Sequence, residues 1–178
     1  MGELQPWRNP RPAPSLNEIR AKTPAPRVLV WLWAWWPALL WAGVIFTMST
    51  DTFSTEHTAT FFEPILHWIR PSLTMVQFAF VHHLIRKSAH FTEYFMFGLL
   101  LYRGVRCGHT GWRWSWALIT LLIAAVYSAS DEFHQWFVPS RGPSVYDSLL
   151  DSIGALVALL VLWLWFRLRR SPNQRVPA

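Results

Sequence analysis

Residues 28–48 read VLVWLWAWWPALLWAGVIFTM, a run of 21 residues without a charged side chain. At about 1.5 Å per residue, a helix of this length matches the ~30 Å hydrocarbon core of a bilayer. Pro37 lies inside the run, and membrane helices tolerate proline where neighbouring groups satisfy the freed backbone. The run exceeds the roughly 7–15 apolar residues of a secretory signal, so we expect an uncleaved membrane anchor.

The composition of the whole chain also indicates a membrane protein. Hydrophobic residues make up 52% of the 178 residues and charged residues 15%, below the roughly 25% typical of soluble domains. The single cysteine excludes an intrachain disulfide and a metal–thiolate cluster. The net charge of +6 lies largely beside apolar segments, which fits orientation among membrane lipids rather than binding to nucleic acid.

Three further segments have the length and apolar content of membrane spans. They cover residues 84–102, 114–136 and 147–165, and each carries charge near one end. We therefore predict an all-α membrane protein with four transmembrane helices in a small bundle. The transmembrane domain covers residues 28–166, between a Pro-rich basic arm, 1–27, and a basic tail, 167–178.

The segment between the first two spans contains FFEPILHWIRP, residues 61–71, whose apolar residues recur at helical spacing. It predicts an interfacial helix lying along the headgroups, or a short helix packed on the bundle. The histidines in loops and interfacial stretches are expected to be solvated rather than to act as ligands: His67, His82, His83 and His109.

The distribution of basic residues predicts the direction of the spans. Twelve Lys and Arg lie in the arm, the loop after the second span and the tail, against four on the other side of the membrane: Arg70, Arg86, Lys87 and Arg141. The positive-inside rule therefore places both termini in the cytoplasm, with the chain crossing the membrane several times. Cys107 then faces the reducing cytoplasm as a free thiol.

This topology gathers polar side chains from three spans at the extracytoplasmic end of the bundle. Asp131, His134 and Gln135 recur at i, i+3 and i+4 and so share a helix face. Asp147 and Asp151 begin a second stripe, which small residues continue inward so that a neighbouring helix can approach closely. The candidate polar cleft consists of Lys87, His90, Glu93, Asp131, Glu132, His134, Gln135, Arg141, Asp147 and Asp151.

Acidic residues outnumber fixed cations in this set by five to two, since Lys87 and Arg141 are its only non-histidine bases. Ionisable groups within a membrane are costly, so these are expected to face the bundle interior and to pair. The excess predicts protonated acids, charged histidines, a bound cation or screening by water. Two interpretations stay open: charges that sit in headgroups or lock helices together, and a functional site built by three helices.

The motifs KSAHFTEYFMFGLLL, residues 87–101, and SDEFHQWFVPSRGPSVYDSLLDSIGA, residues 130–155, resemble the VanZ-like family of bacterial membrane proteins. The resemblance implies that the chain lies in the cytoplasmic (inner) membrane of a bacterium. The chain departs from the family pattern at Ser140, where the family tends to have glycine, and at Asp151, where it usually has asparagine. The family takes its name from a protein linked to low-level teicoplanin resistance. The resemblance implies a fold and a site but no reaction. The matching positions are Lys87, His90, Glu93, Tyr94, Asp131, Glu132, Gln135, Pro139, Arg141, Asp147 and Gly154.

The first functional hypothesis is a role in the cell envelope, in which the cleft binds or modifies an envelope lipid or a glycopeptide-like ligand. A carboxyl group with His90 or His134 would serve as general acid or base. Lys87 and Arg141 would hold a phosphate or carboxylate. The chain has no established catalytic motif and no recognised metal-ligand spacing, so enzymatic activity and any cofactor stay open.

The alternative is an accessory subunit of a larger respiratory or photosynthetic membrane complex. Five tryptophans lie within eleven residues of the first span and point all around that helix, so some must face lipid, pigment or other membrane subunits: Trp31, Trp33, Trp35, Trp36 and Trp41. An ion or proton carrier is less favoured, because the inner halves of the second and fourth spans hold no ionisable side chain.

Overall fold

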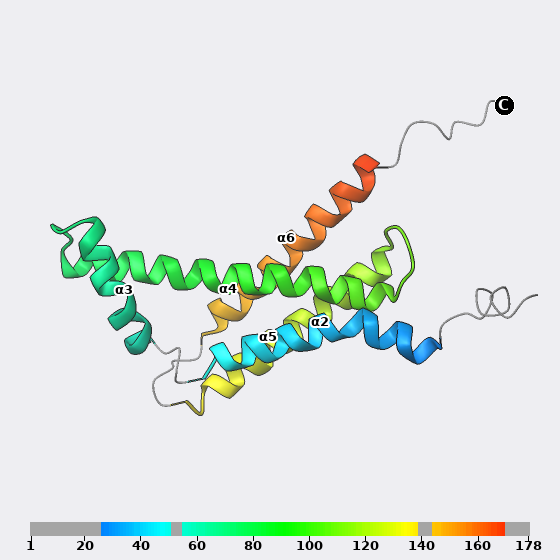
Figure 1. The fold of residues 1–178 in the computed structure, drawn as a ribbon, viewed down its shortest axis with the longest axis horizontal. Helices are drawn as coiled ribbons and strands as arrows, with labels where there is room; N and C mark the ends of the chain where they lie inside the picture. The colour runs from blue at the N-terminus through cyan, green and yellow to red at the C-terminus, as the bar shows by residue number, and fades with distance from the viewer. Residues whose placement is uncertain (1–25, 51–54, 139–143, 170–178) are drawn as a thin grey trace, which may run out of the picture.

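The structure, a computed structural model, describes residues 26–50, 55–138 and 144–169. In these ranges it is helical, without strands, which confirms the prediction of an all-α chain (Figure 1). The helices are α2 (Arg27–Met48), α3 (Thr55–Ile69), α4 (Met75–Arg106), α5 (Trp114–Gln135) and α6 (Val145–Arg169).

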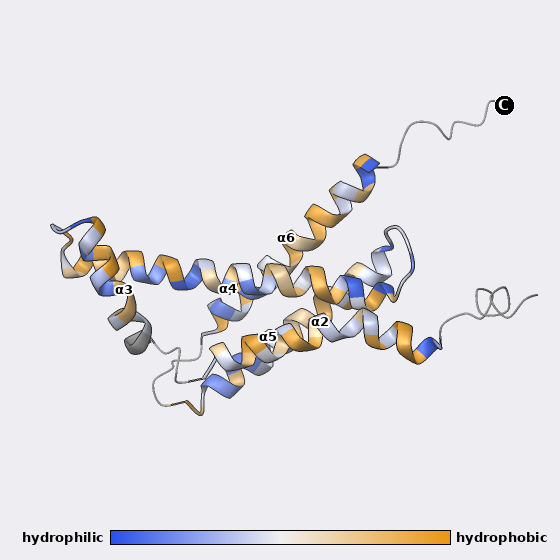
Figure 2. Cartoon of the chain, in the orientation of Figure 1, coloured by the Kyte–Doolittle hydropathy of each residue, from blue (hydrophilic) through white to orange (hydrophobic). Residues whose placement is uncertain are grey.

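Three of the described helices, α2, α5 and α6, are long and apolar enough to cross a membrane. Helix α4 has 32 residues but does not meet the same measure, because Arg86, Lys87 and Glu93 interrupt its apolar sequence. Figure 2 shows this contrast as mixed colouring along α4. A fourth span within α4 therefore stays a prediction.

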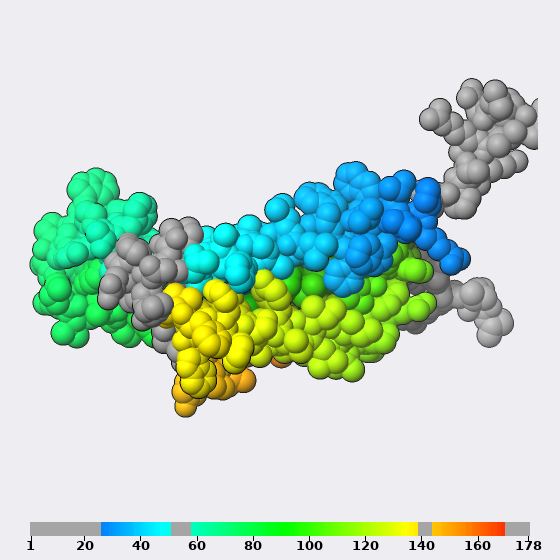
Figure 3. Space-filling model, turned by 90° about the horizontal axis from the view of Figure 1, so that it is seen from below, coloured from blue at the N-terminus to red at the C-terminus, as the bar shows by residue number. Residues whose placement is uncertain are grey.

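Helix α4 is the centre of the bundle, since it packs against α2, α5 and α6. Tyr94, Phe97 and Leu101 on α4 are almost fully buried. They pack with small or aliphatic residues of the three surrounding helices: Ala38, Ile45, Ala124 and Ala155. Figure 3 shows α2 and α5 side by side on one face of this bundle. The core therefore forms around α4, with α2, α5 and α6 packed against it.

Two contacts set the directions of the helices. The Ser49 hydroxyl, at the end of α2, donates to Asp131 near the end of α5 at 2.6 Å. Ser128 on α5 donates to Ser148 in the first turn of α6 at 3.1 Å. Helices α2 and α5 thus finish at the end where α6 begins, and we call this the polar end.

The opposite end of the bundle is rich in arginine, and we call it the arginine end. Arg103, in the last turn of α4, donates to the Ala34 carbonyl near the start of α2 at 3.3 Å, which places these two helix termini together. The arginines at this end are Arg27, Arg103, Arg106, Arg113, Arg167 and Arg169.

Helices α4 and α6 approach closely at two glycines. A Cβ atom on Gly154 would lie 2.6 Å from the Phe91 carbonyl oxygen, and one on Gly98 would lie 3.0 Å from the Ala155 Cα. Neighbouring backbone atoms cannot yield as a flexible side chain does, so both positions require a small residue. The predicted close approach along the small-residue stripe of α6 is confirmed.

Helix α4 begins nine residues before the predicted span, at Met75 rather than residue 84. The Thr74 hydroxyl accepts from the Gln77 amide at 3.3 Å while the Gln77 side chain accepts from the Thr74 amide at 3.2 Å, forming a capping box. Helix α3 packs on this added length of α4 (Figure 1). Its placement at a membrane interface stays a prediction.

The expectation of a solvated His82 is wrong. The side chain is 4% exposed and packs between the rings of Phe62 on α3 and Phe78 on α4, with Nε2 3.2 Å from the Thr58 hydroxyl. Burial, and then the charge of Arg86, lowers the pKa of His82. The histidine is therefore a structural contact between α3 and α4.

Candidate functional site

Two contacts at the polar end connect α4 to α6. Lys87 forms an ion pair with Asp147, and both side chains keep some exposure to solvent. One turn deeper, His90 Nδ1 lies 3.4 Å from Asp151 Oδ1. Asp151 is fully buried and also accepts a 2.8 Å hydrogen bond from the Ser128 hydroxyl of α5. The Asp151 carboxylate thus joins three helices at one point.

Asp131 connects α5 to α2. Its side chain is 5% exposed, and Oδ2 accepts from the Ser49 hydroxyl at 2.6 Å and from the Gln135 amide at 3.1 Å. The predicted i, i+4 relation of Asp131 and Gln135 is therefore a direct hydrogen bond. Neither donor carries a positive charge, so in the described residues the Asp131 carboxylate is held by hydrogen bonds alone.

Glu132 contacts the backbone directly before the start of α6. Its Oε2 accepts from the Ser144 backbone amide at 2.7 Å, and Oε1 is buried without a hydrogen-bond partner among the residues that the structure describes. Burial of a carboxylate oxygen without a donor is unfavourable. This atom is therefore the acceptor in the cluster best placed to bind an added donor.

Glu93 is half-buried on α4, where its charge acts on Arg86 and His90. Its backbone carbonyl accepts from the Trp41 indole at 2.9 Å. Glu93 therefore marks the α2 side of α4, and the cluster around Asp151 lies toward α5 and α6.

His134 does not join His90. Its ring packs against Phe46 of α2 at a centroid distance of 4.8 Å, and its buried Nδ1 has no hydrogen-bond partner among the described residues. Arg141, the remaining predicted member, lies outside the described residues. The structure thus brings seven predicted residues into direct contacts at the polar end: Lys87, His90, Asp131, Glu132, Gln135, Asp147 and Asp151.

Sequence reasoning missed two members of the cluster. Ser128 lies three residues before Asp131 and donates to Asp151, so i, i+3 spacing on α5 could have identified it. Tyr94 is fully buried, and its hydroxyl lies within the electrostatic reach of Ser128, Asp131 and Asp151. Tyr94 matches the family motif but was not included in the candidate polar cleft.

The chemistry open to this arrangement is hydrogen-bond acceptance and proton binding. Asp147 and Asp151 have basic partners, whereas Asp131 and Glu132 have none among the described residues. Such carboxylates can retain a proton or accept a ligand that offers donors or positive charge. No group of three His, Cys, Asp or Glu side chains in the described part of the chain is arranged to hold a metal ion.

Comparison with protein families gives one match, to the family described as VanZ/LLP1, over residues 34–167. Among curated proteins and among solved structures, nothing matches the chain. The matched range includes every residue of the candidate cluster, and the resemblance drawn from the two sequence motifs is confirmed.

Proposed function

The chain belongs to the VanZ/LLP1 family, and we propose that it serves the cell envelope by binding an envelope lipid or a glycopeptide-like ligand at its polar end. The observation that carries this proposal is the buried pair of carboxylates, Asp131 and Glu132, without a described basic partner. Four helices contribute to their surroundings. A purely structural lock would pair each acid with a base, as Lys87 does for Asp147.

The ligand class follows from the donors and acceptors present. Asp131, Glu132 and Gln135 present oxygen acceptors, so a ligand with ammonium, amide or hydroxyl groups would complete the cluster. Lys87 is 29% exposed and stands at the rim, where it would meet an anionic group of the same ligand. Sugar-bearing lipids and glycopeptides offer such mixtures of donors and acidic groups.

The same proposal places α4 across the membrane, with the arginine end in the cytoplasm and the polar end outside. The native Cys107, directly after α4, should be protected from a membrane-impermeant maleimide in intact cells and label only after permeabilisation. In a Cys107→Ser background, Val76→Cys at the exposed start of α4 should label without permeabilisation. Labelling of both positions from the same side would show that α4 does not cross, and the Cys107→Ser protein provides the blank.

Charge-removing variants test the proposed function. In a strain that lacks the native gene, Asp131→Asn and Glu132→Gln should each fail to restore the teicoplanin sensitivity or the envelope lipid composition to the wild-type pattern. Amides keep the side-chain volume but cannot carry the charge or act as a base. Glu63→Gln, at an exposed position on α3, is the matched control and should complement fully. Wild-type behaviour of both site variants at normal protein levels would count against the proposal.

A second candidate is an accessory subunit of a larger membrane complex, favoured by the exposed tryptophans of α2. Trp31, Trp33 and Trp36 are 48%, 66% and 49% exposed. Trp41 and Trp35 are half-buried against α4, the latter on Gly104. Co-migration with a large assembly after gentle detergent extraction, together with unaltered envelope phenotypes, would favour this candidate.

A further inference from the structure

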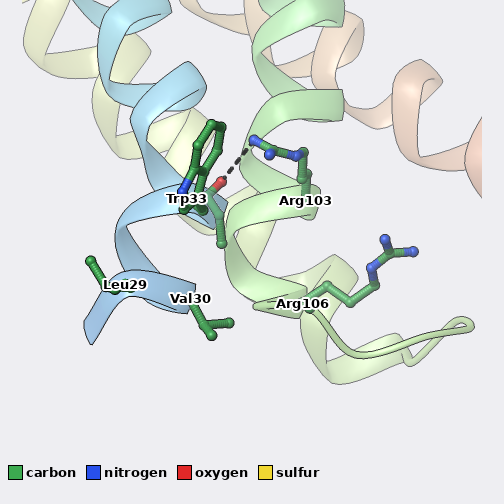
Figure 4. Close-up of a pocket in the computed structure, with 7 residues that line it drawn as sticks. Leu29, Val30, Trp33, Arg103 and Arg106 are labelled. Carbon is green, nitrogen blue, oxygen red and sulfur yellow. Dashed lines mark hydrogen bonds between the residues drawn. The ribbon is translucent and has the colours of Figure 1, made fainter. Parts of the chain in front are cut away.

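A cavity of about 390 Å³ lies at the arginine end, far from the candidate cluster (Figure 4). Leu29, Val30 and Trp33 from the first two turns of α2 form one wall. Arg103 from the last turn of α4 forms the other, and Gly108 lies beyond that helix. The cavity therefore has an apolar wall from the start of α2 and a guanidinium from the end of α4.

Arg103 is the cation that serves this cavity. Its guanidinium donates to the Ala34 carbonyl at 3.3 Å, and the other four of its five N–H groups have no hydrogen-bond acceptor within the described part of the chain. Arg106 contributes its alkyl chain, because its guanidinium lies 5.8 Å from the centre of the Phe166 ring. Figure 4 shows that group turned away from Leu29 and Val30.

The charge at this end lacks a counterpart among the described residues. The described acidic residues lie on α3, near the middle of α4, or in the polar-end halves of α5 and α6, whereas the six arginines lie at the arginine end. The start of α2 adds positive potential, since no side chain caps it. An anion from outside the described chain would balance this charge.

We propose that the cavity binds the phosphodiester headgroup of an anionic phospholipid from the leaflet that meets the arginine end. Arg103 would hold the phosphate through its free N–H groups. Leu29 and Trp33, which are 50% and 66% exposed, continue the apolar wall toward the lipid-facing surface of α2, where the glycerol and acyl chains would lie. A small soluble anion would leave this apolar wall without a partner.

The test is lipid binding to the purified full-length protein in detergent, with bound lipids counted by native mass spectrometry. Phosphatidylglycerol should bind more tightly than phosphatidylcholine, and Arg103→Gln should weaken the phosphatidylglycerol complex about tenfold. Arg113→Gln is the matched control, because Arg113 is at the same end but lies over the Trp116 ring, 4.8 Å from its centre, and does not line the cavity. Arg113→Gln should change phosphatidylglycerol binding less than twofold, because it removes only a distant charge whose attraction salt screens.

A second variant tests the role of the cavity without changing the charge of the protein. Val30→Trp fills the space and keeps every arginine, so it should weaken phosphatidylglycerol binding as Arg103→Gln does, while the thermal transition stays near that of the wild type. Equal losses in Arg113→Gln and Arg103→Gln would overturn the proposal in favour of diffuse attraction. Equal binding of phosphatidylcholine, or displacement of the lipid by inorganic phosphate alone, would also overturn it.

Discussion

Gly154→Ala is expected to destabilise the protein by about 3 kcal/mol, at the upper end of the overpacking range, and Gly154→Val to prevent folding. The added Cβ would lie 2.6 Å from the Phe91 carbonyl oxygen and 3.2 Å from the Phe95 amide nitrogen, both backbone atoms of α4. Only separation of α4 from α6 relieves this contact. Unfolding in mixed detergent and SDS micelles, followed by circular dichroism, measures the free energy of unfolding.

Gly43→Ala is the matched control for this prediction. A Cβ on Gly43 of α2 would meet no atom within 4 Å, so the variant should be neutral or gain up to about 1 kcal/mol from helix propensity. Gly98→Ala should fall between the two, since its closest contact is 3.0 Å. Equal stabilities for Gly154→Ala and Gly43→Ala would show that close packing of α4 on α6 does not hold the bundle together.

The second large effect is expected at the contact between His90 and Asp151. His90→Ala should lower the free energy of unfolding by about 3–5 kcal/mol, because it leaves a fully buried carboxylate with the Ser128 hydroxyl as its described donor. In an Asp151→Asn background the same change should cost far less, since no buried charge remains. The difference between the two costs is the coupling energy of the pair.

Lys87→Ala supplies the comparison at the rim. Lys87 and Asp147 are 29% and 21% exposed, so loss of this pair should cost about 1 kcal/mol or less. A His90→Ala cost that is the same in both backgrounds would show that His90 stabilises the bundle by packing and not by its contact with Asp151.

The fold was predictable where one physical signal dominated. A run of uncharged residues long enough to span a membrane identified α2, and the apolar runs of α5 and α6 were equally plain. Helix α4 was harder to delimit, because its first nine residues mix polar and apolar types and hydropathy alone starts the helix too late. The capping box at Thr74 and Gln77 was present in the sequence and marks the true start.

The candidate cluster was predictable from topology, and its details depended on side-chain direction. Gln135 and Ser128 lie about 40° and 60° to one side of Asp131 on α5, whereas His134 lies about 60° to the other. His134 therefore turns to Phe46 of α2, while Ser128 turns to Asp151 of α6. Spacing placed Asp131, His134 and Gln135 on one face, but only the positions of α2 and α6 decide which neighbour each side chain meets.

In the proposed orientation, the separation of acids and arginines along the bundle would also couple the protein to the membrane voltage. With the arginine end in the cytoplasm, an interior-negative potential would attract the six arginines and repel the carboxylates of the polar end. Moving one elementary charge across 100 mV changes its energy by about 2.3 kcal/mol. The electric field of an energised membrane therefore adds a restoring force against inversion of the inserted chain, and depolarisation removes that force while leaving every contact within the bundle in place.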